Sequence, residues 1–341
     1  MATTRRTTPL LAVLLTLVAA LAAGLRRLLR AGMRPGPADG VRADDGVLLH
    51  VEEDGDPTAP LTVVFSHGFT AQLREFDLQR ETLASRARVV LYDQRGHGRS
   101  GFGKAKNATF DQLGQDLAAV LDARVPTGPV VLAGHSMGGM TLMAYARQHP
   151  EVFGPRVVGV FLLATSAGDL VSTGAAGAAA RLLRALHLLP VYLRLLRLWA
   201  PVLERFRKRG TRAGFFFYKR FLFGRDDAGD ADLVRMVQEL LEETPLTVTA
   251  AFYPSFLSHD EVEALPAMRP VPVTIVVGDS DRLTPVGHSR RMAAELPDAE
   301  LVVVPGAGHS VNITRRQVVD DALLRLLDRA SEYAAGQRRA G

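Results

Sequence analysis

The sequence predicts an α/β fold in which a doubly wound, mostly parallel sheet is flanked by helices and carries a helical cap insertion. Apolar runs of strand length recur along the chain without polar alternation, so both faces of each strand must be covered. Helical patterns separate these runs, as they do in βαβ units. Residues 165–265 interrupt the rhythm with segments rich in leucine, arginine and phenylalanine that contain no clear strand.

The individual elements follow from this alternation. Expected strands cover residues 47–51, 61–66, 88–92, 130–134, 157–163, 271–277 and 301–305. Expected helices cover residues 71–85, 110–123, 136–148, 288–295 and 316–330. We therefore expect a core made of residues 36–164 and 266–335, with residues 165–265 forming a helical cap.

Length and composition fit a single large domain with such an insertion. The chain has 341 residues, and its hydrophobic fraction of 47% is ample for a sizeable core. Because the sequence holds no cysteine, disulfides, thiolate metal sites and cysteine nucleophiles are excluded. The sequence also lacks a P-loop, a dinucleotide fingerprint and a metal-ligand cluster, so we expect no cofactor and no metal.

The formal net charge of +5 conceals two strongly basic segments. Residues 1–34 hold six arginines and no acid, and residues 181–225 hold twelve lysines or arginines against Glu204 alone. Both segments are also rich in leucine or phenylalanine, which suits a membrane surface or an amphipathic ligand better than nucleic acid. We expect no nucleic-acid partner, and a membrane surface is the partner that these segments favour.

Residues 1–35 are predicted to be an N-terminal signal or anchor segment that takes no part in the fold. A short basic start precedes an apolar stretch whose length lies between that of a signal-peptide core and a full membrane span. Small residues at 20 and 22 offer a cleavage site, whereas Arg26 and Arg27 shortly afterwards favour an uncleaved anchor. A cytosolic amphipathic helix is the third interpretation. We expect membrane association or export, with residues 34–40 as the linker.

The stretch VVLAGHSMGGMTL, residues 130–142, places Ser136 where a predicted strand becomes a helix. Gly134 and Gly138 allow a tight turn around it and remove side chains that would collide with the strand and helix, and His135 lies inside that turn. The serine hydroxyl then stands above the carboxyl end of the strand, near the free N–H groups of the helix. This pattern predicts a nucleophile, although serine is also a good helix N-cap.

A serine nucleophile needs a base, and the base needs an orienting acid. His309 lies in PGAGHSV, on a glycine-rich loop directly after the last predicted strand, from which it can reach across the top of the sheet. Asp279 and Asp281 lie in VVGDSDRLTP, directly after the strand before it. Either carboxylate could orient the imidazole on this evidence.

With these motifs the chain resembles the α/β-hydrolase superfamily. The resemblance selects Asp281 as the acid, because Gly278, Asp281 and Pro285 match the family's G-x-x-D-x-x-x-P pattern. Asp279 then satisfies backbone groups of the turn. The order Ser136, Asp281, His309 is the order that this superfamily uses.

The oxyanion hole is the second feature that the resemblance implies. In the elbow geometry the backbone N–H of Met137 supplies one donor. SHGFT, residues 66–70, is similar to the family's His-Gly oxyanion loop, which implies a second donor at the N–H of Phe69. His67 and Gly68 are then supporting residues, with His67 bracing the loop.

A further stretch, YDQRGHGRS at residues 92–100, resembles the family's D-x-R-G-x-G-x-S segment. There Asp93 and Arg95 are implied to order the glycine turn. The resemblance spans roughly residues 45–165 and 268–330, and its motifs are specific for the fold and the triad but say little about the substrate.

Serine at the elbow separates the chain from relatives that open epoxides or remove halogen through an aspartate. A serine alkoxide attacks acyl carbon to give an acyl-enzyme that water can hydrolyse. The leading hypothesis is therefore a serine hydrolase for carboxylic esters, with a small-molecule or lipid ester as substrate and lipid-like or apolar acyl groups preferred.

Several alternatives stay open. Cofactor-free haloperoxidase-like, C–C-bond-hydrolysing and acyltransferase relatives also use serine at this position. A membrane-tethered binding protein that uses the basic cap is a non-enzymatic alternative. Leucine and arginine at helical spacing in the cap fit either a cover over the active site or a lid that faces lipid.

Overall fold

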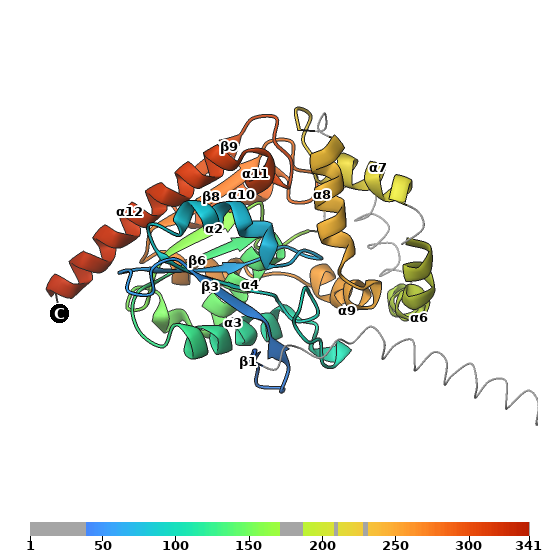
Figure 1. The fold of residues 1–341 in the computed structure, drawn as a ribbon, viewed down its shortest axis with the longest axis horizontal. Coiled ribbons are helices and arrows are strands. Elements are labelled where there is room, and N and C mark those ends of the chain that lie inside the picture. The colour runs from blue at the N-terminus through green and yellow to red at the C-terminus, as the bar shows by residue number, and fades with distance from the viewer. Residues whose placement is uncertain (1–38, 171–186, 208–210, 228–230, 341) are drawn as a thin grey trace, which may run out of the picture.

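The structure is a computed structural model that describes residues 39–170, 187–207, 211–227 and 231–340 (Figure 1). A seven-stranded sheet forms its centre, with the strand order β3-β5-β4-β6-β7-β8-β9. Neighbouring strands are parallel except for β3, which pairs with β5 in the antiparallel sense. The strands are β3 (Val51–Asp54), β4 (Thr62–Ser66), β5 (Arg88–Tyr92), β6 (Val130–His135), β7 (Val157–Leu163), β8 (Val273–Gly278) and β9 (Glu300–Val304). The predicted mostly parallel sheet is confirmed.

The prediction of one strand over residues 47–51 is wrong in one respect, because the chain forms two separate strands there. β2 (Leu48–Leu49) pairs with β1 (Val41–Arg42) in a separate two-stranded sheet, and β3 starts after His50. At His50 the backbone N–H donates to the hydroxyl of Ser100 at 2.8 Å. The hydroxyl of Ser100, in another loop, therefore accepts the hydrogen bond that a backbone oxygen of a neighbouring strand would accept in a continuous strand.

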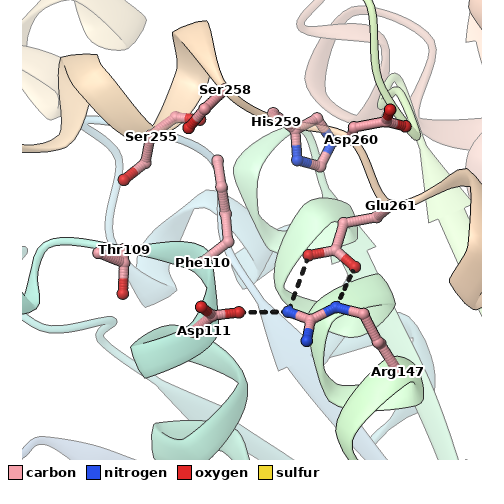
Figure 2. A pocket seen from close by; sticks show the side chains of 9 residues that line it. All are labelled: Thr109, Phe110, Asp111, Arg147, Ser255, Ser258, His259, Asp260 and Glu261. Atoms are coloured by element: carbon pink, nitrogen blue, oxygen red, sulfur yellow. Dashed lines mark hydrogen bonds and ion pairs between the residues drawn. The ribbon is translucent and has the colours of Figure 1, made fainter.

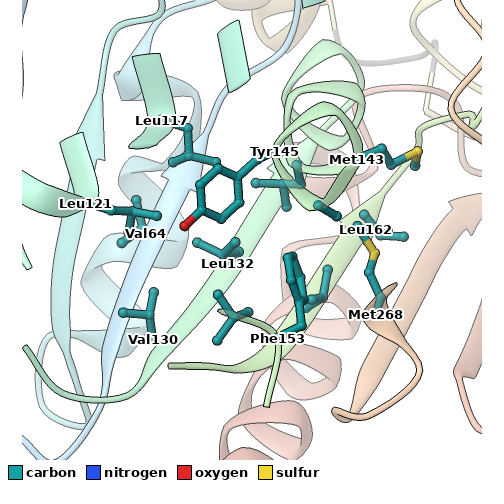
Figure 3. Packing of buried hydrophobic residues seen from close by; sticks show 14 of the residues in the cluster. Val64, Leu117, Leu121, Val130, Leu132, Met143, Tyr145, Phe153, Leu162 and Met268 are labelled. Atoms are coloured by element: carbon teal, nitrogen blue, oxygen red, sulfur yellow. The ribbon is translucent and has the colours of Figure 1, made fainter. Parts of the chain in front are cut away.

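Helices cover both faces of the sheet, as a doubly wound arrangement requires. α3 (Phe110–Arg124), α4 (Met137–Gln148) and α10 (Val286–Glu295) cover one face, and α2 (Asp77–Leu83) and α12 (Arg316–Ala340) cover the other. Figure 3 shows Leu117, Met143 and Tyr145 packed on strand residues of the first face. Successive strand residues point to opposite cores, which explains why the strand sequences are apolar throughout.

Shorter elements complete the core. The helix predicted over residues 71–85 is divided into a 3₁₀ turn, η1 (Leu73–Phe76), and α2. The last helix continues to residue 340, beyond its predicted end. The remaining short elements are η2 (Ala105–Asn107), η3 (Pro150–Val152), η4 (Val262–Met268) and α11 (Val311–Thr314).

Between β7 and β8 the described residues form helices and no strand of the sheet. These helices are α6 (Leu189–Arg207), α7 (Thr211–Phe221), α8 (Ala231–Glu242) and α9 (Leu246–Leu257). They lie together beside the sheet, at the opposite end of the molecule from the C-terminus of α12 (Figure 1). Ala167, Ala264 and Leu265 belong to the core cluster under the sheet, so both ends of the insertion pack with the core. The division into core and cap stays a prediction.

In the part of the chain that the structure describes, no helix has both the length and the hydropathy needed to cross a membrane. The predicted signal or anchor segment, residues 1–35, lies outside the described residues.

Candidate active site

Ser136 is the single residue between the end of β6 and the start of α4. Its φ of 51° and ψ of −115° lie in a region that residues with side chains rarely adopt. The two flanking glycines make this turn possible. A Cβ at Gly138 would overlap the backbone oxygen of Ser66, and one at Gly134 would lie 2.6 Å from the carbonyl carbon of Gly138. The elbow therefore depends on glycine at both positions.

Asp281 and His309 meet at the carboxyl ends of β8 and β9. Nδ1 of His309 donates to Oδ2 of Asp281 at 2.8 Å, and both side chains are buried. The other carboxylate oxygen, Oδ1, accepts the backbone N–H groups of Leu283 at 2.8 Å and Thr284 at 2.9 Å. Burial alone would raise the pKa of Asp281, but the adjacent His309 and these hydrogen bonds outweigh it and hold the pKa below its ordinary value. An ionised Asp281 thus fixes the orientation of the His309 ring.

Asp279, the other acid considered from the sequence, has different partners. Its Oδ1 accepts the backbone N–H of Gly306 at 2.9 Å and the hydroxyl of Ser280 at 2.9 Å. The carboxylate therefore organises the turns at the ends of β8 and β9, and the hydrogen bond to the imidazole belongs to Asp281.

His135 brings the loop that carries His309 next to the elbow. Its Nε2 donates to the backbone oxygen of His309 at 3.1 Å, and the two ring centroids are 4.9 Å apart. The hydrogen bonds between described residues include none from the Ser136 hydroxyl to the His309 ring. The structure shows the hydrogen bond between His309 and Asp281, and it places the loop that carries His309 beside His135. The contact between Ser136 and His309 stays a prediction.

Glu75 is a member of this site that the sequence analysis missed. Its Oε1 accepts from Nδ1 of His135 at 3.0 Å, and its Oε2 accepts the backbone N–H of Gly68 at 2.7 Å. Burial alone would raise the pKa of Glu75 and lower that of His135, but their mutual attraction reverses both shifts. The two side chains therefore form a buried ion pair that connects residue 68 with the elbow.

The loop that contains Phe69 packs directly against the elbow. His67 donates from Nδ1 to the backbone oxygen of Gly68 at 2.8 Å, and its Nε2 accepts the backbone N–H of Gln94 at 2.9 Å. Burial lowers the pKa of His67, so its ring is neutral and braces the loop. A Cβ at Gly68 would lie 2.8 Å from Nδ1 of His135. The roles of the Phe69 and Met137 N–H groups as oxyanion donors stay predictions.

Comparison with known proteins now gives the family. Residues 62–315 match a family model described as the alpha/beta hydrolase fold. The chain belongs to the α/β-hydrolase family. The fold and the resemblance inferred from the sequence motifs are confirmed.

Known α/β-hydrolases and their relatives align with most of this chain. A Caulobacter sp. (strain K31) protein that bears the provisional name carbamate hydrolase RutD is 27% identical over 298 residues, which are 86% of this chain and 98% of that protein. A non-heme haloperoxidase of Rhodococcus erythropolis is 27% identical over 300 residues, covering 84% of this chain and 98% of the haloperoxidase. The structure of a thermophilic esterase from Thermogutta terrifontis superposes with a TM-score of 0.66 at 25% identity, covering 85% of this chain and 97% of the esterase.

Helix α9 of this α/β-hydrolase contacts the loop that carries Phe69. The Phe69 ring lies 4.7 Å from the ring of Phe256 and 6.3 Å from that of Phe252, measured between centroids, and both residues belong to α9. Met137 and Met140 of α4 share the same apolar cluster. The start of α4 and the loop that carries Phe69 therefore pack with α9 in one buried apolar cluster.

The insertion also holds the loop that carries His309, through Asp227, which the sequence analysis missed. The buried carboxylate of Asp227 accepts the backbone N–H of Gly308 at 3.0 Å. One residue beyond His309, the N–H of Ser310 donates to the backbone oxygen of Leu222 at 3.0 Å. Backbone groups on both sides of His309 are thus bound by residues of the insertion.

Two surface pockets in the described residues contain none of the predicted site residues. The pocket in Figure 2, of about 330 Å³, surrounds Arg147, whose guanidinium is paired with Asp111 and with Glu261 at 2.8 Å. Arg147 lies eleven residues after Ser136 along α4, which corresponds to about 16 Å of helix. The second pocket, of about 270 Å³, is lined by residues that include Gly168 and His288. The candidate active site is therefore defined by its side-chain geometry and not by these pockets.

Proposed function

We propose that the protein is a serine hydrolase that cleaves carboxylic esters through Ser136, His309 and Asp281. The observation that carries the proposal is the buried hydrogen bond of 2.8 Å between His309 and Asp281. It lies at the same edge of the sheet as Ser136, which directly follows β6 and has a positive φ. Membership of the α/β-hydrolase family and the likeness to the esterase of Thermogutta terrifontis support it.

In the proposed reaction, Asp281 accepts the Nδ1–H of His309, so that Nε2 carries the lone pair. Nε2 removes the proton of Ser136 as Oγ forms a bond to the acyl carbon. His309 then passes this proton to the leaving alcohol as the ester C–O bond breaks, which leaves an acyl-enzyme. Water attacks the acyl-enzyme in the same way, releases the carboxylic acid and returns the proton to Ser136.

The oxyanion that forms in each half of this reaction needs hydrogen-bond donors. We assign that role to the backbone N–H groups of Phe69 and Met137, which belong to the loop and the helix that pack together at the elbow. A donor of this kind lowers the barrier by about 3–4 kcal/mol in a serine protease of unrelated fold.

Lipid-like or apolar acyl groups are the substrates that we propose for this site. Met137, Met140 and Phe252 are buried in an uncharged apolar cluster beside the elbow, and Phe256 packs against it, so an acyl chain bound next to Ser136 would border apolar side chains. We further propose that the protein acts at a membrane or after export, as the apolar segment in residues 1–35 suggests.

A fluorophosphonate probe, which reacts with activated serines, tests the nucleophile. We expect labelling of the wild-type protein and of Ser258→Ala, which removes an exposed serine of α9's C-terminal turn, and none of Ser136→Ala. Equal labelling of wild type and Ser136→Ala would contradict the proposed nucleophile.

The likeness to a haloperoxidase keeps a second reaction in view, because haloperoxidase-like or C–C-bond hydrolysis would use the same triad. A series of p-nitrophenyl esters of increasing chain length separates the possibilities. Hydrolysis that rises with chain length supports an esterase for apolar acyl groups. A protein that takes the fluorophosphonate label but turns over no ester in the series would favour the second reaction.

A further inference from the structure

Helix α6 exposes a broad apolar face. Eight large apolar side chains on α6 and at the residue before it are each between 37% and 54% exposed. Successive members are one or three residues apart, which places them on one side of a helix. This α6 apolar face consists of Leu188, Val191, Tyr192, Leu195, Leu198, Trp199, Val202 and Leu203.

The opposite side of α6 contacts the protein. Ala200 is only 1% exposed, and the carboxylate of Glu204 accepts the backbone N–H of Leu246, at the start of α9, at 3.0 Å. In Figure 1, α6 lies beside α9 at the margin of the molecule. An amphipathic helix on a protein in water usually buries its apolar side, whereas the eight large apolar side chains of the α6 apolar face are exposed.

An exposed apolar face of this size indicates a binding surface. The sequence around it is strongly basic, since residues 181–225 contain twelve lysines or arginines and one acid. Of these, Arg194 on α6 and Arg220 at the end of α7 are exposed. A second copy of the chain would bring two basic segments together, and an acidic surface would neutralise them.

We propose that the α6 apolar face docks onto an anionic lipid bilayer. The leucine, valine and aromatic side chains would enter the boundary between headgroups and acyl chains, and the arginines would pair with lipid phosphates. Trp199 and Tyr192 suit that depth, because each has an apolar ring and a polar group that can remain hydrated. The surface does not depend on the triad, so docking and ester hydrolysis can be tested apart.

The sequence supplies a direct probe, because Trp199 is the single tryptophan of the whole chain. Vesicles that contain phosphatidylglycerol should shift the emission of Trp199 in the full-length protein to shorter wavelength. Lipids brominated in their acyl chains should quench it. Vesicles of phosphatidylcholine alone, or high salt, should give a weaker response because they remove or screen the attraction between charges.

Variants locate the contact. Replacing both Leu195 and Leu198 by glutamate should lower the vesicle partition coefficient reported by Trp199 by more than about tenfold, because two charges would enter the interface. Val318→Glu, on α12 at the far side of the sheet, adds a charge at a residue that is 38% exposed and should bind as the wild type does. Ser136→Ala should also bind normally, whatever its effect on ester hydrolysis.

Three results would overturn the proposal. Flotation of the protein with vesicles without a change in Trp199 emission would place the membrane contact elsewhere, for example in residues 1–35. Emission already shifted in buffer, together with the mass of a dimer, would show that a second copy covers the face. Equal partitioning of the double glutamate variant and the wild type would also refute it.

Discussion

The substitution Asp281→Asn gives the sharpest test of the proposed base, because the structure dictates how the new amide would lie. In the wild type, Oδ1 accepts two backbone N–H groups, from Leu283 at 2.8 Å and Thr284 at 2.9 Å. Only an oxygen can satisfy these donors, so the amide oxygen of asparagine would take this place. Its NH₂ group would then replace Oδ2, which lies 2.8 Å from Nδ1 of His309.

An NH₂ group at that position can donate but not accept. Nδ1 of His309 would have to become the acceptor, and the ring proton would move to Nε2. That tautomer cannot remove the proton of Ser136. We expect kcat/KM for p-nitrophenyl esters to fall by about 10³- to 10⁴-fold, the size of loss that follows when a serine enzyme's histidine is held in the wrong tautomer. This corresponds to about 4–5.5 kcal/mol of lost transition-state stabilisation.

Asp279→Asn is the matched control, because it makes the same chemical change two residues away. Its carboxylate binds Gly306 and Ser280 and not the imidazole, so kcat/KM should stay within about tenfold of wild type. Thermal unfolding of both variants would separate lost activity from lost fold. If folded Asp281→Asn retained more than about a tenth of the activity, or if Asp279→Asn were the more damaging change, the assignment of the acid would be refuted.

Two further predictions concern the frame around the elbow. Glu75→Gln should destabilise the protein by about 3–5 kcal/mol, because it leaves the charge of His135 buried without its partner. The lowered pKa of Glu75 makes the pair's contribution disappear as acid protonates the carboxylate, and the raised pKa of His135 makes it disappear at alkaline pH. The gap between wild type and variant in urea unfolding should therefore be largest between the ordinary pKa values of 4.5 and 6.5, and a gap that does not vary with pH would contradict the ion pair. Gly138→Ala should cost about 1–3 kcal/mol or more in the same assay, because its methyl group would overlap the backbone oxygen of Ser66. Gly336→Ala in α12, where a Cβ has open space, should be neutral or stabilising, and a similar loss in both variants would contradict the steric reasoning.

Local pattern was enough to predict the sheet and the residues at its carboxyl edge. Strands buried on both faces must be apolar throughout, so runs such as residues 130–134 and 271–277 stand out in the sequence. Ser136, Asp281 and His309 each follow such a run directly, and parallel strands bring those ends to one edge.

Contacts across long sequence separations were not predictable in the same way. Glu75 meets His135 sixty residues away, and Asp227 meets Gly308 eighty-one residues away. Neither acid lies in a motif, and each resembles an ordinary surface carboxylate when the sequence is considered alone. The broken strand at His50 has a similar cause, because the bond that interrupts it comes from Ser100 in another loop.

The sequence pattern of α6 does not determine which side of this helix faces the protein. Leucine and arginine at helical spacing establish that the helix has two sides, and both a cover over the site and a lid toward lipid satisfy that spacing. The pattern does not say which side contacts α9, whereas the structure shows that Ala200 is buried and that Glu204 accepts the backbone N–H of Leu246. A lid that faces lipid stays a proposal.

The insertion contacts two parts of the candidate site, the loop that carries Phe69 and the loop that carries His309. The proposed reaction needs these two loops held at a fixed position relative to each other. α9 packs on Phe69, whose N–H is a proposed oxyanion donor, and Asp227 binds the backbone beside His309, the proposed base. Because α6 packs on α9, a bilayer bound to the α6 apolar face would be one helix away from Phe69. Under the proposed docking, a substrate whose acyl chains come from a membrane would account both for the exposed α6 apolar face and for the uncharged apolar cluster beside the elbow.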